Sequence, residues 1–569
     1  MTEERVNRWF PLTACCLSLV MLALFPVQAK AAGVAKLSNH PLCQHLGNTM
    51  QASSGAQMAC FGAQFNGGGG PSPREARIAS GTTSFRANVN AASFSEDISP
   101  AGVRAFGQSE TSIAAAGPYV VEAWNDSTHF LSPPCSPQSK DQGTGFGFSN
   151  DGGLTFKDLG GLPNSNCAIS STEGDPSVEA FQVGGNTFFY ITSIFIPFTV
   201  PENAMSVTTC QVKGSGTTAT LSCGDPQVMA ISSQCDPKHT ICSFLDKDFL
   251  TLDPGRKRLY LSFTEFGINF APPDHLSNGQ IELAACDLTN PAKPVCSNGN
   301  AGSVSRPYFI VARGDLSCER EGAYPGVAVG NGDVYVAHEF NWASNVFGGD
   351  GTCFSKPTQD QMARVPFSCL PKPPAVSACG PPSIVARQNI VSMAAAFIPG
   401  YNRFPMNDFP RVAVSNAKGV VSMVWNDAGD NPKGNILLQS YRLNTLLRVQ
   451  GTPVAINNDT GSFAWHFLPA IRYADSGLLD VSWYDRRFNP NSAITDVFAA
   501  LNVDPTSTTT PGSNAQVNDA SSDWNAASSD IIPNFGDYTD NYFNASTGLF
   551  VAWSDGRTSI PQPFNAKKK

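Results

Sequence analysis

One pattern recurs seven times along this chain, and it restricts the possible folds more than any other feature of the sequence. Each copy begins with an acidic or polar residue, often followed by a proline. Two short apolar segments follow, separated by a turn that contains glycine or asparagine. Apolar and polar residues alternate with period two within the segments, which indicates paired β-strands. The copies span residues 109–126, 174–193, 246–266, 323–340, 408–427, 467–487 and 536–557.

These copies must stack on one another, because a single hairpin cannot bury its own apolar face. From Trp124 to Trp553 they lie about 72 residues apart, against roughly 40–50 in common propeller repeats, so long loops must connect them. Further strand-like segments follow the hairpins, for example residues 434–443 and 495–503. The sequence therefore predicts an all-β fold, a seven-bladed β-propeller of four-stranded antiparallel blades. Six blades are the alternative if one copy is an excursion from the ring.

The two ends of the repeat region suggest how the ring closes. Too few residues follow Arg557 for two full strands, whereas residues 82–94 precede the first copy and can supply a strand to the last blade. We therefore assign residues 82–569 to the propeller, closed by an N-terminal strand. Residues 32–81 are assigned to an extension with a Gly-rich linker.

Residues 1–31 have the features of a secretory signal peptide. A polar start with two arginines precedes the apolar run of residues 14–25, which is too short to span a bilayer comfortably. Ala29-Lys30-Ala31 then fits a small-x-small cleavage site. We expect a secreted or periplasmic protein, a monomer without a membrane span.

The cysteine count agrees with export. Of 16 cysteines, Cys15 and Cys16 belong to the signal peptide, and the even remainder is typical of a disulfide framework. Close spacing predicts the pairs Cys43–Cys60, Cys135–Cys167, Cys210–Cys223, Cys235–Cys242 and Cys286–Cys296. The partners of Cys318, Cys353, Cys369 and Cys379 stay open.

Charge excludes one class of function. The formal net charge is -9, and only 15% of residues are charged, against about 25% in typical domains. Proteins that bind nucleic acids normally carry a basic surface that neutralises phosphates. We therefore expect no nucleic-acid partner.

A short motif after the first copy connects the repeats with a known family. Residues 149–156 read Ser-Asn-Asp-Gly-Gly-Leu-Thr-Phe, which resembles the Asp-box (S-x-D-x-G-x-T-W/F) of the sialidase-like (BNR) superfamily of β-propellers. In such a turn a short acid and a hydroxyl can bond the backbone, and glycine permits a positive φ. Five residues are therefore assigned a structural role: Ser149, Asp151, Gly153, Thr155 and Phe156.

The same resemblance implies a catalytic site that this sequence matches only in part. Active sialidases carry an F/Y-R-I-P motif in the first blade, whose arginine helps to hold the substrate carboxylate. The matching strand here reads Ser109-Glu110-Thr111-Ser112-Ile113, without an arginine. The family's three-arginine cluster, aspartate acid/base and Tyr–Glu nucleophile pair do not map onto this sequence residue by residue.

Hairpin geometry gathers carboxylates on one face of the ring, since the start of strand one and the end of strand two share a face. In the sialidase family this face also carries the active site. The acids either bond loop backbone and pair with neighbouring arginines, or a subset binds a carbohydrate or Ca²⁺. No other cofactor is assigned. The substrate-binding candidates from the strand starts are Glu110, Asp175, Asp246, Glu321 and Asp408.

The sixth and seventh copies are richest in groups suited to chemistry on an acidic sugar. Carboxylates, a tyrosine and a histidine could perform acid/base work there, and arginines could bind an anion. The catalytic candidates are His466, Asp485, Asp537 and Tyr538, and the anion-binding candidates are Arg486, Arg487 and Arg557. The alternative is a purely structural role, in which these arginines form ion pairs that hold loops in place.

Together these features predict an exported sialidase-like propeller that acts on an extracellular glycan or glycoconjugate. One hypothesis is a glycoside hydrolase of acidic sugars, an exo-sialidase-like enzyme. The other is a non-catalytic propeller that binds glycan or protein, and a polysaccharide lyase on the same scaffold is a third alternative. The missing first-blade arginine favours a binding module, whereas the late copies keep the enzyme hypothesis open.

Overall fold

The computed structural model describes Ser53, Ala56 and most of residues 84–569. The undescribed stretches within that range are 98–106, 132–134, 136–141, 233–242, 267–278, 297–307, 314–317, 319 and 342–356, with positions 96, 376, 404, 405 and 460. The predicted signal peptide, almost all of the extension at 32–81 and the predicted pairs Cys43–Cys60 and Cys235–Cys242 lie outside the described residues.

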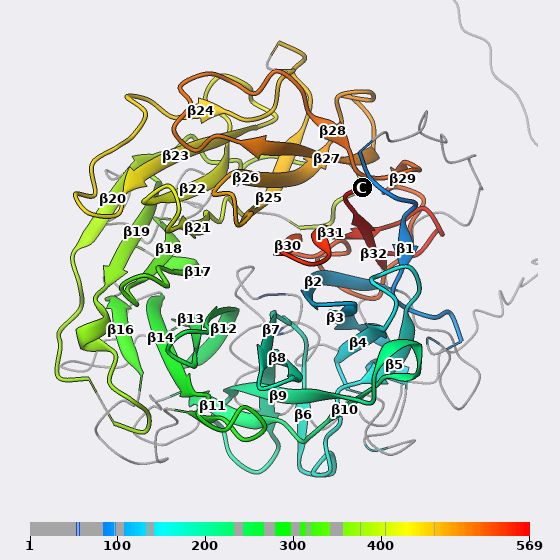
Figure 1. The fold of residues 1–569 in the computed structure, drawn as a ribbon. Coiled ribbons are helices and arrows are strands. Elements are labelled where there is room, and N and C mark those ends of the chain that lie inside the picture. The colour runs from blue at the N-terminus through cyan, green and yellow to red at the C-terminus, as the bar shows by residue number, and fades with distance from the viewer. Residues whose placement is uncertain are drawn as a thin grey trace, which may run out of the picture.

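Seven antiparallel sheets stand around one axis, which confirms the predicted seven-bladed β-propeller (Figure 1). Blade one contains β2 (Gln108–Ala116), β3 (Tyr119–Asp126), β4 (Thr144–Ser149) and β5 (Lys157–Gly161). Blade two contains β6 (Ser170–Thr172), β7 (Val178–Val183), β8 (Asn186–Pro197), β9 (Ala204–Lys213), β10 (Thr220–Cys223) and β11 (Gln227–Ile231). Blade three contains β12 (Phe244–Asp253), β13 (Arg258–Phe266), β14 (Gln280–Asp287), β15 (Val295–Cys296) and β16 (Phe309–Ala312).

The second half of the ring follows the same plan. Blade four contains β17 (Arg320–Val327), β18 (Val334–Phe340), β19 (Gln359–Val365) and β20 (Ile384–Asn389). Blade five contains β21 (Arg411–Ser415), β22 (Val420–Asp427), β23 (Asn435–Arg442) and β24 (Val454–Ala455). Blade six contains β25 (His466–Tyr473), β26 (Leu479–Asp485), β27 (Ile494–Val503), β28 (Ala515–Gln516) and β29 (Ser522–Asp523). Blade seven contains β30 (Asp540–Asn544), β31 (Gly548–Asp555) and β32 (Gln562–Lys567).

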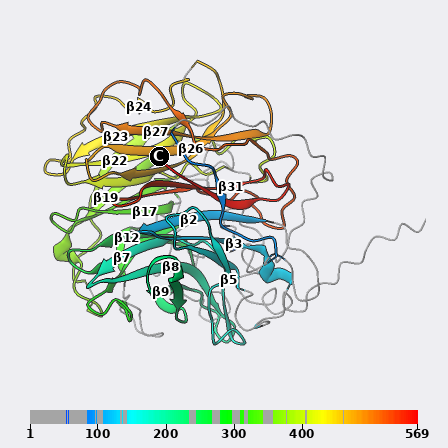
Figure 2. The same ribbon diagram turned by 45° about the vertical axis from the view of Figure 1, so that its right-hand side comes forward.

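The outermost strand of blade seven comes from the N-terminal side of the ring. Strand β1 (Val89–Asn90) pairs antiparallel with β32, and Val89 lies opposite Asn565. Three short 3₁₀ helices complete the described elements: η2 (Ser127–Leu131), η3 (Gly216–Thr218) and η4 (Phe367–Cys369). No helix in the described part of the chain is long and apolar enough to cross a membrane. Figure 2 shows the ring turned by 45°, with β17 above β12 and β12 above β7.

Tryptophans of the repeated hairpins form much of the core between blades. Trp124, Trp425, Trp483 and Trp553 are all fully buried. In blade six the indole Nε1 donates to the carboxylate two residues later, Trp483 to Asp485, at 2.8 Å. Trp553 and Asp555 repeat this bond at 2.8 Å in blade seven. The tryptophan-x-carboxylate ending of the hairpin therefore stabilises blades six and seven internally.

Disulfides join neighbouring strands and turns, as the cysteine spacing suggests. The pairs Cys135–Cys167, Cys210–Cys223 and Cys286–Cys296 are confirmed. A fourth bridge, Cys369–Cys379, joins two of the cysteines whose partners the sequence left open. Cys210 and Cys223 are direct cross-strand partners, as are Cys286 and Cys296, so the ladder itself brings these thiols together.

The turn at residues 149–156 is held by its own side chains. Asp151 Oδ1 accepts from Ser149 Oγ at 2.8 Å and from the Thr155 backbone N–H at 3.0 Å, and Asp151 Oδ2 accepts from Thr155 Oγ1 at 2.7 Å. Burial of the Asp151 carboxyl is slight, and the bonds from Thr155, Ser149 and Leu154 outweigh it and lower its pKa. Gly153 has φ +82°, and a Cβ there would lie 2.5 Å from the Phe550 ring of blade seven. Glycine therefore lets this turn pack against the neighbouring blade.

Candidate functional site

A repeated β-bulge turns acidic and basic side chains toward the axis. In blades one, three, four and six the register of the innermost hairpin shifts near the start of the first strand. Glu110, Asp175, Lys247 and Leu468, near the start of their inner strands, have φ between 51° and 60°. Non-glycine residues reach this region at a cost, and such strain gathers at functional sites. The bulge therefore marks the axial end of the inner strands as the place to look for a site.

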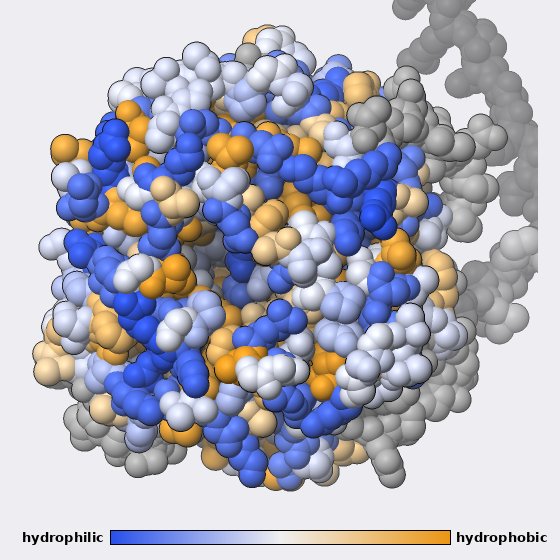
Figure 3. Space-filling view, in the orientation of Figure 1, coloured by the Kyte–Doolittle hydropathy of each residue, from blue (hydrophilic) through white to orange (hydrophobic). Residues whose placement is uncertain are grey.

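The side chains that meet there are called the axial cluster: Glu110, Asp175, Asp246, Lys247, Glu321, Arg403 and Asp537. All seven are buried, and none is more than 3% exposed. They come from blades one, two, three, four and seven and from the loop before blade five. Figure 3 shows that the face drawn there is hollowed near the centre of the ring, with hydrophilic residues around the hollow.

Asp537 is the hub of the axial cluster. Its Oδ2 accepts a hydrogen bond from the Lys247 ammonium on the far side of the ring and lies 3.1 Å from Arg403 Nη1. Burial alone would raise the pKa of Asp537, but Arg403 and Lys247 together hold it below its ordinary value. Burial would lower the pKa of Lys247, and the Asp537 charge raises it instead. Asp537 is therefore ionised, and both cations keep their charge.

Hydrogen bonds tie this hub to the first two blades. The Asp537 backbone N–H donates to Glu110 Oε1 at 2.9 Å. Asn125 Nδ2 donates to Glu110 Oε2 at 2.7 Å, and Asn125 Oδ1 accepts from the Asp175 N–H at 2.6 Å. Burial, followed by the charges of Glu110 and Asp246, holds the pKa of Asp175 well above its ordinary value. Glu110 and Asn125 thus join blades one, two and seven through hydrogen bonds.

The pKa of Glu321 is shifted in the opposite direction to that of Asp537, although both groups belong to the axial cluster. Burial raises the pKa of Glu321 to about 8, although Lys247 and Arg403 lower it in part. Within the described residues, neither of its carboxyl oxygens accepts a hydrogen bond. At neutral pH, therefore, Glu321 is a carboxylic acid while Asp537 is a carboxylate. Environments that push two neighbouring carboxyl groups apart in pKa are typical of acid/base pairs.

An aromatic layer lies against the axial cluster. The Arg411 guanidinium lies 4.3 Å from the Phe249 ring centre, 4.7 Å from that of Tyr324 and 5.5 Å from that of Tyr538. Tyr538 donates its hydroxyl to Pro176 O at 2.9 Å. Burial lowers the pKa of Arg411, and the nearby tyrosines and carboxylates oppose this in part. Stacking on three rings gives this buried guanidinium a favourable cation–π environment.

A third layer closes the axis with polar side chains. Arg472 Nη2 binds Glu179 Oε1 at 2.9 Å, which joins blade six to blade two across the ring. Tyr542 donates to Glu179 Oε2 at 3.3 Å, and Ser112 Oγ donates to Asp540 Oδ2 at 2.7 Å. Burial raises the pKa of Asp540 to about 6. These contacts join blades one, two, six and seven across the ring.

A second group of acids adjoins the cluster at blades four and five. Glu339 lies opposite Glu321 on one side and Asp360 on the other in the strand ladder. Burial, with the neighbouring acids, holds the pKa of Glu339 and Asp360 well above their ordinary values. Burial also raises the pKa of Asp408 to about 7, although bonds from Ser392, Met393 and Asn426 oppose it. Asp408, a predicted binding residue, thus lies with these protonated acids.

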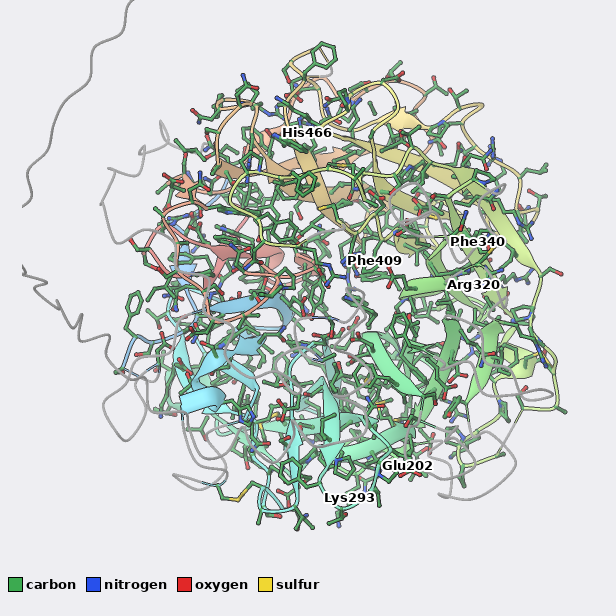
Figure 4. All side chains as sticks on the ribbon, turned by 180° about the vertical axis from the view of Figure 1, so that it is seen from behind. Glu202, Lys293, Arg320, Phe340, Phe409 and His466 are labelled. Carbon is green, nitrogen blue, oxygen red and sulfur yellow. A yellow bond between two sulfur atoms is a disulfide. The ribbon has the colours of Figure 1, made fainter. Side chains whose placement is uncertain are left out.

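The residues predicted from blade six lie in a separate ion-pair network, and Figure 4 shows His466 farther from the middle of the ring than Phe409. His466 Nε2 lies 3.0 Å from Asp459 Oδ1 and 3.6 Å from Asp485 Oδ2, while Nδ1 lies 2.8 Å from Gly434 O. Arg487 binds Asp485 through its Nε at 3.0 Å and its Nη2 at 2.6 Å. These ionic contacts hold the loops of the blade together.

Asp459, His466 and Asp485 are, in the described part of the chain, the one group with three side chains close enough to hold a metal ion. Their donor atoms already serve other partners. Asp485 Oδ2 also accepts from Trp483 Nε1 and Arg487, and Arg487 Nη2 lies 3.5 Å from Asp459 Oδ1. Burial would lower the pKa of His466, but Asp459 and Asp485 raise it. In this structure His466 and Arg487 are therefore already the ionic partners of these two carboxylates.

The other predicted arginines are also engaged within the protein. Arg486 is buried, and its guanidinium donates to Pro399 O and Ser492 O, each at 2.9 Å. Arg557 binds Asp555 at 2.8 Å and Asp519 at 2.5 Å. Of the predicted site residues, the structure brings together Glu110, Asp175, Asp246, Glu321, Asp537 and Tyr538, and places His466, Asp485, Arg486, Arg487 and Arg557 elsewhere.

Sequence reasoning missed Arg403 and did not assign roles to Lys247 and Arg411. Arg403 lies between two repeats, where the strand pattern predicts no site residue. One signal was available, because Arg403-Phe404-Pro405 has the Arg-x-Pro spacing of the motif sought only in the first blade. Lys247 and Arg411 lie inside a repeat, but only the ring brings them to the axis.

Comparison with known proteins returns no matching family model and no matching curated protein. Among solved structures, an α-L-arabinofuranosidase of Fusarium graminearum is 10% identical, and the match covers 85% of this chain and 97% of that chain at a TM-score of 0.38. A sialidase of Trypanosoma rangeli is 9% identical, with 86% and 59% covered and a TM-score of 0.38. An α-L-arabinanase of Penicillium chrysogenum is 10% identical, with 77% and 98% covered and a TM-score of 0.36. None of these similarities assigns a role to a residue of this chain, and the propeller fold rests on the seven sheets themselves.

Proposed function

We propose that this chain is an exported glycoside hydrolase of sialidase-like architecture that acts on extracellular glycans with acidic sugars at its axial cluster. The observation that carries the proposal is the opposite pKa shift of two carboxyl groups in one buried site. Glu321 has a pKa of about 8, whereas Asp537 is held below its ordinary pKa. Glycoside hydrolases of most families need such a pair, one acid and one carboxylate.

The roles follow from the two protonation states. Glu321 gives its proton to the glycosidic oxygen as the bond to the anomeric carbon breaks, so the departing sugar leaves as an alcohol. The Asp537 carboxylate stabilises the positive charge that develops on the sugar ring. Water adds to the anomeric carbon, and its released proton returns to a carboxylate of the axial cluster.

A preference for an acidic sugar is supported by the buried cations. Lys247 and Arg403 bind Asp537, and Arg411 stacks on aromatic rings beside them. Among the described residues Arg411 Nη1 has no hydrogen-bond partner, so its N–H groups can donate to an anionic ligand. The disulfides support work outside the cytosol, and we propose a secreted or periplasmic monomer.

The test compares two leaving groups in matched variants. Glu321→Gln removes the acid, so hydrolysis of sialyllactose, whose leaving group needs a proton, should fall by about 10²–10⁴-fold. Hydrolysis of an aryl sialoside with an acidic phenol as leaving group should fall much less. Glu122→Gln is the control, because burial also raises the pKa of Glu122 to about 8 although this group lies between blades one and seven, bonded to Asn565.

Two further results bear on the same proposal. The kcat/KM of the wild type should fall as the pH rises through about 8, because Glu321 then loses the proton it must donate. If Glu321→Gln and Glu122→Gln behave alike on both substrates, Glu321 is not the acid and the proposal is wrong.

A non-catalytic glycan-binding propeller is the second candidate. The observation that favours it is the burial of the axial cluster, in which Lys247, Arg403 and Asp537 already pair with one another. Binding of sialyllactose without turnover by the folded wild type would decide for this alternative.

A further inference from the structure

A groove of about 560 Å³ opens at the rim of the ring, between blades two and three. We call it the rim groove; residues from the ranges 209–227 and 292–295 line it. Strands β9 and β10 with the start of β11 form one wall, and the turn between β14 and β15 forms the other. Figure 4 shows Lys293, from the second wall, at the edge of the ring, whereas Phe409 lies near its middle. The rim groove is therefore separate from the axial cluster.

The two walls of the rim groove are fixed relative to each other. One disulfide joins β9 to β10, and a second joins β14 to β15. Two hydrogen bonds cross from blade two to blade three. Gln227 Nε2 donates to Pro294 O at 2.8 Å, and the Tyr190 hydroxyl donates to Pro291 O at 3.0 Å. A site that is already rigid pays less ordering entropy when a ligand binds, which favours affinity.

Each wall contributes one ammonium group. Lys213 comes from β9 and Lys293 from the opposite turn, and both side chains are exposed. Lys213 Nζ donates to Gln211 Oε1, and Gln211 Nε2 donates to Asn186 Oδ1 at 3.1 Å, so these amides hold the ammonium in place. An ammonium has three N–H donors, so Lys213 keeps two for a ligand.

The rim groove has a positive charge in an acidic protein. Its one acid, Asp225, accepts from the Ser165 backbone N–H at 2.7 Å and from Ser165 Oγ at 2.6 Å. Two lysines and one aspartate give the lining a net charge of +1, whereas the whole chain has a formal net charge of -9. The carboxylate is already bonded within the protein, so the charge that the groove offers to a ligand is that of the lysines.

The uncharged part of the lining suits a sugar. Thr209 and Ser222 supply hydroxyl groups, which can donate or accept hydrogen bonds. Val295 is 46% exposed and supplies an apolar surface for the C–H groups of a sugar ring. Binding sites of this kind combine apolar contacts with a few polar groups that fix orientation. The lining therefore fits a ligand that carries both carboxylates and hydroxyl groups.

We propose that the rim groove binds a segment of an acidic oligosaccharide, whose carboxylates contact Lys213 and Lys293. This binding does not need the chemistry of the axial cluster. That the bound glycan is also a substrate rests on the proposed function, in which the rim groove holds one part of a long chain while another part is hydrolysed.

The first test measures binding by titration calorimetry of the full chain with Glu321→Gln, which slows turnover of the probe. The probes are a sialic acid hexamer, the neutral maltohexaose and the peptide hexaglutamate. Adding Lys213→Met and Lys293→Met should weaken binding of the sialic acid hexamer by about 5–30-fold, the effect of losing two exposed charge contacts. Lys157→Met with Lys569→Met is the control, because it removes two exposed lysines outside the groove.

A second variant blocks the rim groove without changing its charge. A Cβ at Gly224, which lines the groove, would meet only Thr209 O, at 4.0 Å, so a larger side chain fits there. Gly224→Tyr should therefore fill part of the groove and also weaken binding of the hexamer. Because the lysine contacts are exposed, binding by the parent protein should weaken as NaCl rises from about 0.1 M to about 1 M.

Each outcome supports or overturns the proposal. Unchanged affinity in the lysine variant or in Gly224→Tyr overturns the rim groove as the binding site. Equal affinity for maltohexaose overturns the role of charge, and equal affinity for hexaglutamate shows that the groove takes acidic peptides instead of glycans. Binding that depends on the lysines and on Gly224, with no sialoside turnover by the wild type, supports the rim groove and shows that the proposed hydrolase function is wrong.

Discussion

The buried charge at the hub of the axial cluster gives a sharp stability prediction. Asp537→Asn removes one negative charge from between Lys247 and Arg403 with little change in volume. Both cations contact the same oxygen of Asp537, and all three side chains are buried. Removing one partner of such a set leaves charge uncompensated in the interior and costs about 3–5 kcal/mol. This is a large part of the total stability of about 5–15 kcal/mol that is typical of folded proteins.

The neighbouring acids determine how this cost changes with pH. Glu321 has a pKa of about 8, and Asp175 is held well above its ordinary pKa. The Asp537 charge helps to raise the pKa of Glu321, so its loss lowers that pKa, and at high pH Glu321 can ionise and replace the missing charge. At pH 5 Glu321 and Asp175 stay protonated, while Asp537 of the wild type, with its lowered pKa, is still ionised. The deficit of the variant should therefore be larger at pH 5 than at pH 9.

Urea unfolding at the two pH values measures the free energies. Asp225→Asn is the control, since this exposed carboxylate bonds only Ser165 among the described partners and its loss should change stability by less than about 0.5 kcal/mol. Adding Lys247→Met to Asp537→Asn removes one of the two cations that lack a counter-charge in the single variant. It should recover part of the lost free energy of unfolding. A single variant within about 1 kcal/mol of the wild type at both pH values, or a double variant no more stable than the single, would refute the reasoning.

Two further predictions concern other parts of the ring. His466 has a raised pKa in the folded protein, so the stability from its imidazolium is complete below the ordinary histidine pKa and is lost as the pH rises through the folded value. His466→Gln should therefore flatten the fall of the unfolding free energy as the pH rises above the ordinary histidine pKa, and a profile parallel to the wild type would contradict this. Gly153→Ala should cost about 1–3 kcal/mol more than Gly152→Ala in urea unfolding, because both positions have positive φ but only the Cβ at 153 meets the Phe550 ring, at 2.5 Å. Equal losses in the two variants would show that the contact with blade seven is not rigid.

The local sequence pattern predicts some residues of the axial cluster but not the others. The start of each inner strand is readable from the repeat, so Glu110, Asp175, Asp246 and Glu321 were predicted for the axial face. The Trp-Tyr-Asp-Arg-Arg run of blade six was also conspicuous, and its Asp485 and Arg487 bind each other. A sequence shows that an acid and a base are near each other, but not whether they face a ligand or pair with one another.

By itself, the sequence determined the hairpin repeat, a propeller of seven or six blades, the shared face of the strand starts and three of the short-range disulfides. Each of these depends on residues close in the chain, whose alternation and spacing already dictate the geometry. Only the tertiary structure decided that Lys247, Arg403 and Asp537 form one ion cluster and that Ser53 lies against Asp246. Those groups are hundreds of residues apart, and their protonation depends on burial and on charges from opposite blades. Closure of the ring is what brings them together and removes the water around them.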